Sequence, residues 1–134
     1  MVCRILVVDD ESSANFMIKQ IFRREIKAGT YELFFAANGL EALDLMARQP
    51  LEMVLSDINM PEMDGLKLLE QIYHIYPEVR VIMLSAYSDL RRVRHAMNYG
   101  AFDYLTKPVE ATDLRETVHK LVGFIAEGKE RNKA

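Results

Sequence analysis

The sequence contains one cysteine, Cys3, no tryptophan and only three histidines. A single cysteine excludes an internal disulfide and a zinc site built from several thiolates, so we interpret Cys3 as a buried, inert thiol in the first strand. His74, His95 and His119 lie far apart on expected helices. The sequence therefore offers no imidazole zinc site, and we expect these three side chains to be solvated.

A signal-peptide pattern and an apolar stretch of membrane-spanning length are also missing from the sequence. We therefore expect a cytoplasmic protein without membrane contact. Charge of either sign is not in large excess, because 17 basic residues face 20 acidic ones and the formal net charge is -3. Such a balance provides no general positive field, so we expect no direct contact with nucleic acid.

Short β-branched runs alternate with longer stretches of helical periodicity, which indicates repeated strand–helix units. The chain has 134 residues, half of them apolar, which is enough for one domain with a substantial core. We expect strands at about residues 4–8, 31–36, 53–56, 81–84 and 102–105. The predicted helices run from Ser12-Ser13 to near Gly29, from Asn38 to before Pro50, through Leu66, Leu69 and Ile72 to Pro77, from Ser88 or Asp89 to Gly100, and through Leu114, Val118, Leu121 and Ile125.

Right-handed crossovers between parallel strands place helices on both faces of a sheet. We therefore predict an α/β fold, a flavodoxin-like doubly wound sheet of five parallel strands in the order 2-1-3-4-5. This order makes the first and third strands neighbours and brings Asp10 beside Asp57. Residues 1–125 form the predicted domain. Residues 126–134 are polar and charged, and their composition fits a charged helix end and the start of a linker equally well.

Four of the expected strands end on polar side chains, which are Asp9 and Asp10, Asp57, Ser85 and Lys107. Parallel strands present their carboxyl ends at one edge of the sheet, where open α/β sheets place their chemistry. Carboxylates about 4 Å apart repel by roughly 4 kcal/mol at an effective dielectric constant of about 20. Cations are therefore needed to offset the repulsion between these carboxylates. Lys107 supplies one, and Mg²⁺ or Mn²⁺ suits the remaining oxygen ligands.

A carboxylate held between a divalent cation and a lysine can attack phosphorus and form an acyl phosphate. Asp57 is the best candidate for this phosphoacceptor. Asp9 and Asp10 are better placed as metal ligands, and the backbone carbonyl of Asn59 is a further candidate ligand.

Each of these motifs also has an ordinary explanation when it is considered alone. An Asp-Asp pair after a strand usually caps a helix or forms a turn, the segment 61–65 reads as a turn, and Lys107-Pro108 can simply end a strand, with a cis peptide bond as one option. Tyr104 would ordinarily be a partly buried strand aromatic. The joint occurrence of the motifs, each after the correct strand, is what favours a functional site.

Over about residues 3–125 the sequence resembles the receiver domain of two-component response regulators. The matching segments are ILVVDDE at 5–11, SDINMPEMDG at 56–65, LSA at 84–86 and GAFDYLTKP at 100–108. The resemblance implies that Asp57 accepts a phosphoryl group from a histidine kinase or phosphotransfer protein. It also implies that Asp9 and Asp10 bind Mg²⁺ and that Lys107 contacts the acyl phosphate.

The resemblance further implies that Ser85 and Tyr104 form a switch pair. Their coupled reorientation would transmit phosphorylation to the face made by the helix after residue 88, the strand at 102–105 and the last helix. A charge-assisted hydrogen bond from Ser85 to the phosphoryl group is worth roughly 1.5 to 3 kcal/mol, enough to bias two states separated by a few kcal/mol. The output would be a further domain or a protein partner, which the sequence does not identify.

Two side chains flanking the site, Asn59 and Tyr87, are expected to tune hydrolysis. Tyr87 is bulky and can restrict the attacking water, which predicts a moderately long-lived phosphoryl group. The output face carries charges of opposite sign on its two helices, which suits a symmetric, phosphorylation-dependent homodimer, although a merely solvated face explains them as well. These residues are Arg91, Arg92, Arg94 and His95 on one helix and Asp113 and Glu116 on the other.

The competing interpretation is an enzyme, a metal-dependent aspartyl-phosphate phosphatase of the haloacid dehalogenase type. In those enzymes the nucleophile usually follows the first strand and a second Asp stands two residues later. Here Asp57 follows the third strand and Asn59 stands in place of that Asp. A flavin-binding module is disfavoured because the loop after the first strand lacks phosphate-cradling glycines. We therefore expect a signalling switch that catalyses its own phosphoryl transfer and dephosphorylation.

Overall fold

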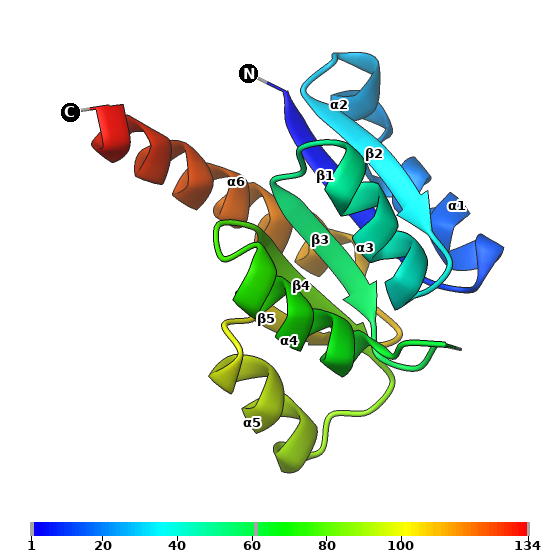
Figure 1. The fold of residues 1–134 in the computed structure, drawn as a ribbon. Helices are drawn as coiled ribbons and strands as arrows, with labels where there is room; N and C mark the ends of the chain where they lie inside the picture. The colour runs from blue at the N-terminus through cyan, green and yellow to red at the C-terminus, as the bar shows by residue number, and fades with distance from the viewer. Residues whose placement is uncertain (1, 61, 134) are drawn as a thin grey trace.

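The computed structural model describes residues 2–60 and 62–133, with side chains described up to residue 128. Pro61, part of the predicted turn, and Ala134 lie outside the described residues. Strands and helices alternate along the chain (Figure 1). Their bounds are β1 Cys3–Val8, α1 Ser12–Ile21, α2 Arg23–Lys27, β2 Tyr31–Ala36, α3 Gly39–Arg48, β3 Met53–Asp57, α4 Gly65–Ile75, β4 Arg80–Ser85, α5 Leu90–Asn98, β5 Asp103–Thr106 and α6 Ala111–Lys133.

The five strands form one parallel sheet in the order β2-β1-β3-β4-β5. Core residues of α3, α4 and α5 pack on one face of this sheet, and those of α1 and α6 pack on the other (Figure 1). The predicted doubly wound fold and strand order are therefore confirmed.

Both faces of the sheet are buried, which explains why the strands are continuous apolar runs. In β1, Leu6 and Val8 belong to one core cluster, whereas Ile5 and Val7 belong to the other. This alternation follows from the two-residue side-chain period of a strand. Cys3 is buried in the same strand, as predicted.

Asp and Asn side chains begin three of the helices that connect the strands. Asn38 accepts a hydrogen bond from the Glu41 amide at 2.9 Å, and Asp64 accepts one from the Lys67 amide at 2.9 Å. Asp89, rather than the alternative Ser88, caps α5. Each cap satisfies an amide that the first helical turn leaves without an intrahelical partner.

The prediction of one helix from Ser12 to near Gly29 is wrong, because the chain turns at Phe22 and separates α1 from α2. Phe22 is fully buried at this position, with its ring centroid 5.7 Å from that of Tyr31. Strand β5 is also displaced by one residue from the expected range. The Lys107-Pro108 peptide bond is cis, which was one of the options considered.

Helix α6 continues beyond Ile125, the end of the predicted domain, and remains helical to Lys133, as in the predicted alternative of a charged helix end. Its C-terminal part projects beyond the sheet (Figure 1). Residues 126–133 are thus helical, and their role as the start of a linker stays a prediction. No helix in the described part of the chain has both the length and the apolarity needed to cross a membrane.

Candidate functional site

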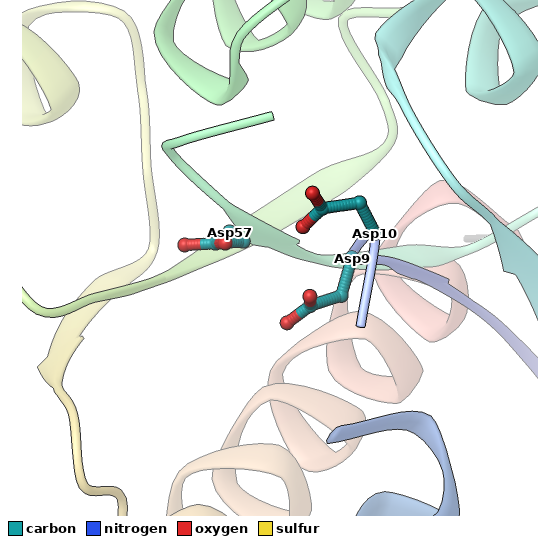
Figure 2. Close-up of side chains that lie close together, drawn as sticks. All are labelled: Asp9, Asp10 and Asp57. Atoms are coloured by element: carbon teal, nitrogen blue, oxygen red, sulfur yellow. The ribbon is translucent and has the colours of Figure 1, made fainter. Parts of the chain in front are cut away.

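Three carboxylates converge at the carboxyl ends of β1 and β3. Asp9 and Asp10 follow β1, Asp57 ends β3, and one carboxylate oxygen from each lies within 4.8 Å of the other two. Figure 2 shows the three side chains directed into a common space. The pairing of β1 with β3, in which Val8 lies opposite Ser56, produces this convergence.

The three carboxylates differ in burial and in their hydrogen bonds. Asp9 is only 4% exposed, Asp57 is partly buried and Asp10 is exposed. The Glu11 amide donates to Oδ1 of Asp9 at 2.9 Å, and the Ile58 amide donates to Oδ1 of Asp57 at 2.8 Å. These backbone bonds fix the two inner carboxylates, while Asp10 faces solvent.

Lys107 lies between the two inner carboxylates. Its Nζ is 3.1 Å from Oδ2 of Asp9 and 3.5 Å from Oδ1 of Asp57. Burial lowers the pKa of Lys107, but Asp57 and Asp9 outweigh that effect and raise it above its ordinary value. Burial raises the pKa of Asp57, with Lys107 lowering it and Asp9 raising it further. One ammonium therefore leaves the cluster of carboxylates only partly compensated.

The donor set fits a hard divalent cation. Carboxylate oxygens are the ligands that Mg²⁺ and Mn²⁺ prefer, and the described residues include no cluster of imidazoles or thiolates at this position. His74 and His119 are exposed as expected, whereas His95 is only half-exposed because it packs against Glu70 on α4, with Nε2 and Oε1 3.2 Å apart. The role of the exposed Asn59 as a carbonyl ligand stays a prediction.

Ser85 and Tyr104 are joined through the backbone of Tyr87. Ser85 ends β4, is 1% exposed, and its Oγ accepts a hydrogen bond from the Tyr87 amide at 3.0 Å. The hydroxyl of half-buried Tyr104, in β5, donates to the carbonyl of the same Tyr87. The Lys107 amide donates to the Ser85 carbonyl at 2.7 Å. One peptide segment thus contacts both residues of the predicted switch pair.

Gly65 packs against the site, although the sequence predicts it only as the end of a turn and of the matching segment 56–65. Its amide donates to the Ile58 carbonyl at 2.8 Å, and a Cβ placed on it would lie 2.0 Å from the Asp57 carbonyl oxygen. Only glycine fits this close approach of α4 to the backbone of Asp57. The available signal was the Asp64-Gly65 dipeptide at a helix start after the strand that carries Asp57.

Arg92, which is predicted to lie on the output face, also contacts residues next to the site. Its guanidinium carbon is 4.6 Å from the centroid of the Tyr87 ring, and its NH1 is 2.5 Å from Oδ1 of Asp89. The hydrogen bond from Arg92 lowers the pKa of Asp89. The spacing of Asp89 and Arg92, three residues apart at a helix start, was the signal for this pair.

The sequence pattern of the response regulator receiver domain matches residues 5–119. The chain belongs to this family. It is 33% identical over 117 residues to sporulation initiation phosphotransferase F of Bacillus subtilis, covering 87% of this chain and 91% of that protein. It is 37% identical over 123 residues to the DNA-binding transcriptional regulator NtrC of Escherichia coli, covering 92% of this chain and 25% of NtrC.

A solved receiver domain from Methanospirillum hungatei is also similar, with a TM-score of 0.87 and 31% identity, covering 96% of this chain and 99% of that one. The chain is thus a receiver domain of two-component signal transduction, which is a signalling switch. No comparison favours the haloacid dehalogenase alternative.

Proposed function

We propose that Asp57 is the phosphoacceptor of this receiver domain, in a reaction that depends on a divalent cation. The convergence of Asp9, Asp10 and Asp57 beside Lys107 is the observation that supports this assignment. Asp9 and Asp57 each accept a bond from one backbone amide and contact Lys107. Asp57 ends the central strand β3 and is only partly buried, whereas Asp9 is more deeply buried and Asp10 is exposed.

The proposed step is a phosphoryl transfer to a carboxylate oxygen of Asp57. An oxygen–phosphorus bond forms while the bond between phosphorus and the donor's imidazole nitrogen breaks, and that nitrogen keeps the electron pair. Lys107 carries the positive charge that faces the incoming phosphoryl oxygens, because its raised pKa keeps it protonated. Asp9 orients Lys107 through the 3.1 Å contact.

Asp9, Asp10 and Asp57, with the carbonyl of Asn59, would hold Mg²⁺ or Mn²⁺. When bound, the cation supplies charge neutralisation between the carboxylates and the phosphoryl oxygens. The chain's own contribution is to hold the two inner carboxylates in place through the Glu11 and Ile58 amides.

The switch pair is proposed to report the new charge at Asp57. Ser85 gains a charge-assisted hydrogen bond to a phosphoryl oxygen, which competes with its present bond from the Tyr87 amide. Because Tyr104 bonds the Tyr87 carbonyl, movement of this segment affects both side chains. The proposed output face is formed by α5, β5 and α6.

Tyr87 and Asn59 are proposed to set the lifetime of the phosphoryl group. The Tyr87 ring is held by Arg92 on a segment that contacts Ser85 directly. We expect Tyr87→Ala to shorten the phosphoryl half-life, measured by loss of radiolabelled phosphate. An unchanged half-life would contradict this role.

The proposed partners are a histidine kinase or phosphotransfer protein as donor and a further domain or separate protein as output. The two relatives described above suggest both arrangements, since the chain spans 91% of one and 25% of the other. We place the protein in the cytoplasm, without nucleic acid or membrane contact by this domain.

The test is incubation with acetyl phosphate and Mg²⁺, followed by intact-mass measurement. We expect one added phosphoryl group on the wild-type chain, none on Asp57→Asn, and none after chelation of the metal. Asp44→Asn, which changes an exposed carboxylate on α3, is the matched control and should be phosphorylated normally. Phosphorylation of Asp57→Asn, or turnover of added phosphoesters, would contradict the proposal.

A further inference from the structure

A groove of about 800 Å³ runs along the outer side of β2. Strand β2 is an edge of the sheet and pairs only with β1. Residues of α1 and α2 form the other wall of the groove. Its floor includes Tyr31, Leu33 and Phe35 of β2, and the helical wall includes Lys19, Arg23 and Lys27.

Strand β2 has few of the features that normally prevent an edge from pairing with another strand. Its six residues pair with β1 in an uninterrupted register, its sequence YELFFA contains no proline, and Glu32 is its only charged residue. Edge strands present outward backbone N–H and C=O groups, and proteins usually protect them with lysine, proline or a bulge. The outer edge of β2 is therefore suited to accept an additional strand.

The cations on the groove's helical wall form an exposed row. Lys19, Arg23 and Lys27 are all exposed, and the Lys19 ammonium lies 4.9 Å from the centroid of the Phe35 ring. Within the described part of the chain, neither Arg23 nor Lys27 is within ion-pair distance of a carboxylate. This basic row occurs on a chain whose formal net charge is -3.

The spacing of these cations matches that of side chains on an extended strand. Residues four apart on a helix are separated by about 6 Å along its axis. Helical hydrogen bonds continue through the turn at Phe22, so the four-residue spacing holds from Lys19 to Lys27. The Phe22 amide donates to the Ile18 carbonyl at 3.1 Å, and the Ile26 amide donates to the Phe22 carbonyl at 2.9 Å. Alternate side chains of a strand lie about 6.6 Å apart on one face. Alternate carboxylates of an extended peptide would therefore meet successive cations.

We propose that this groove binds an extended acidic segment of a partner protein. The segment adds as a strand to the outer edge of β2 and places every second side chain, a carboxylate, against Lys19, Arg23 and Lys27. The proposal concerns a surface separate from the α5–β5–α6 face and does not depend on phosphorylation of Asp57.

The test uses an eight-residue peptide, blocked at both ends, in which Glu and Thr alternate. Titrated into the ¹⁵N-labelled chain, it should shift amide signals of β2 and of residues 19–27. A second peptide with four Glu followed by four Thr has the same composition without the alternation, and we expect it to bind more weakly.

Arg23→Glu and Arg24→Glu form a matched pair, because both are exposed, adjacent on α2 and changed identically, but only Arg23 lines the groove. We expect Arg23→Glu to weaken binding about tenfold, and Arg24→Glu by less than about twofold. Absence of shifts on β2, equal effects of the two variants, or equal binding of the two peptides would each overturn the proposal.

Discussion

The backbone of Asp57 is packed from behind by the first residue of α4. A methyl group at Gly65 would meet the Asp57 carbonyl oxygen at 2.0 Å, so Gly65→Ala must displace the backbone of Asp57. We expect a loss of about 1 to 3 kcal/mol in unfolding free energy and slower phosphorylation by acetyl phosphate. Denaturant unfolding and intact-mass time courses measure the two effects.

Gly123→Ala is the control for the Gly65 variant. Gly123 lies exposed within α6 with no atom near its virtual Cβ, so alanine should stabilise the chain by about 0.5 to 1 kcal/mol through helix propensity. If Gly65→Ala has the unfolding free energy and the phosphorylation rate of the wild type, the close approach of Gly65 to Asp57 matters neither for stability nor for the reaction.

The carboxylate of Asp57 opposes folding when it is charged. Because the fold raises its pKa above the ordinary 3.8, its contribution favours the folded state below pH 3.8 and is lost as pH rises through the folded pKa. Asp57→Asn should therefore raise the melting temperature by a few degrees at pH 7 without divalent cations. The gain should shrink as the pH approaches 3.8.

Thermal melts across this pH range, with and without Mg²⁺, check the Asp57 prediction. Added Mg²⁺ should stabilise the wild type more than Asp57→Asn, because a ligand that binds the folded state raises its stability. A lower melting temperature for Asp57→Asn at pH 7 would contradict the assigned cost of the charge.

The polar strand ends at Asp9, Asp57 and Lys107 were predictable because the strand order alone brings them to one edge of the sheet. Gly65 and Arg92 were not identified, for a different reason. The role of Gly65 depends on how closely α4 approaches β3, which residue spacing does not give. The spacing of Asp89 and Arg92 indicates an ion pair, but not that the Arg92 side chain lies over the Tyr87 ring.

At the scale of elements, a charged clamp formed by Glu25 of α2 with Arg115 and His119 of α6 links these two helices. Arg115 NH2 lies 2.6 Å from Oε2 of Glu25, His119 Nε2 lies 3.1 Å from the same oxygen, and Arg115 NH1 also donates to the Ile21 carbonyl at 2.5 Å. Burial raises the pKa of Glu25, but hydrogen bonds from Arg115 and His119 outweigh this and lower it below 4.5. The clamp secures the point where the chain turns at Phe22.

Glu25→Gln should lower the unfolding free energy by about 1 kcal/mol at pH 7, because it removes the charge that Arg115 binds. A lowered folded pKa means that this stabilisation is present above pH 4.5 and is lost as pH falls through the folded pKa. Denaturant unfolding of both proteins at pH 7 and near pH 3 measures the difference.

Asp44→Asn is the control for Glu25→Gln, since Asp44 pairs with Arg48 on the exposed side of α3. We expect it to change stability by less than about 0.5 kcal/mol. Equal effects of the two variants would show that the partly buried ion pairs of Glu25 contribute no more stability than a surface pair.

Helix existence was predictable from periodicity, but the turn at Phe22 was not. The periodic apolar pattern continues across it, with Ile18 and Phe22 both buried, so nothing in the spacing indicates a break. The clamp at Glu25 was also missed, because Arg115 and His119 follow it by 90 and 94 residues.

At the scale of the whole molecule, the charges on α5 and α6 predict a phosphorylation-dependent dimer. Arg91 on α5 and Glu116 on α6 are exposed, whereas Arg92 is engaged with Asp89 in its own helix. We expect Arg91→Glu and Glu116→Arg each to weaken dimerisation about tenfold in the phosphorylated state. Sedimentation with and without a phosphoryl mimic checks this, and unchanged association in both variants would remove the idea.

The contact between Lys107 and Asp9 joins residues 98 positions apart in the chain. The Lys107 ammonium therefore reaches the carboxylates only after β5 has joined the sheet. Contacts between residues so far apart in the sequence slow folding. A nascent or partly unfolded chain would carry Asp57 without its lysine. Under the proposed mechanism, in which Lys107 faces the incoming phosphoryl oxygens, the chain therefore becomes fully able to accept a phosphoryl group only when the last strand is in place.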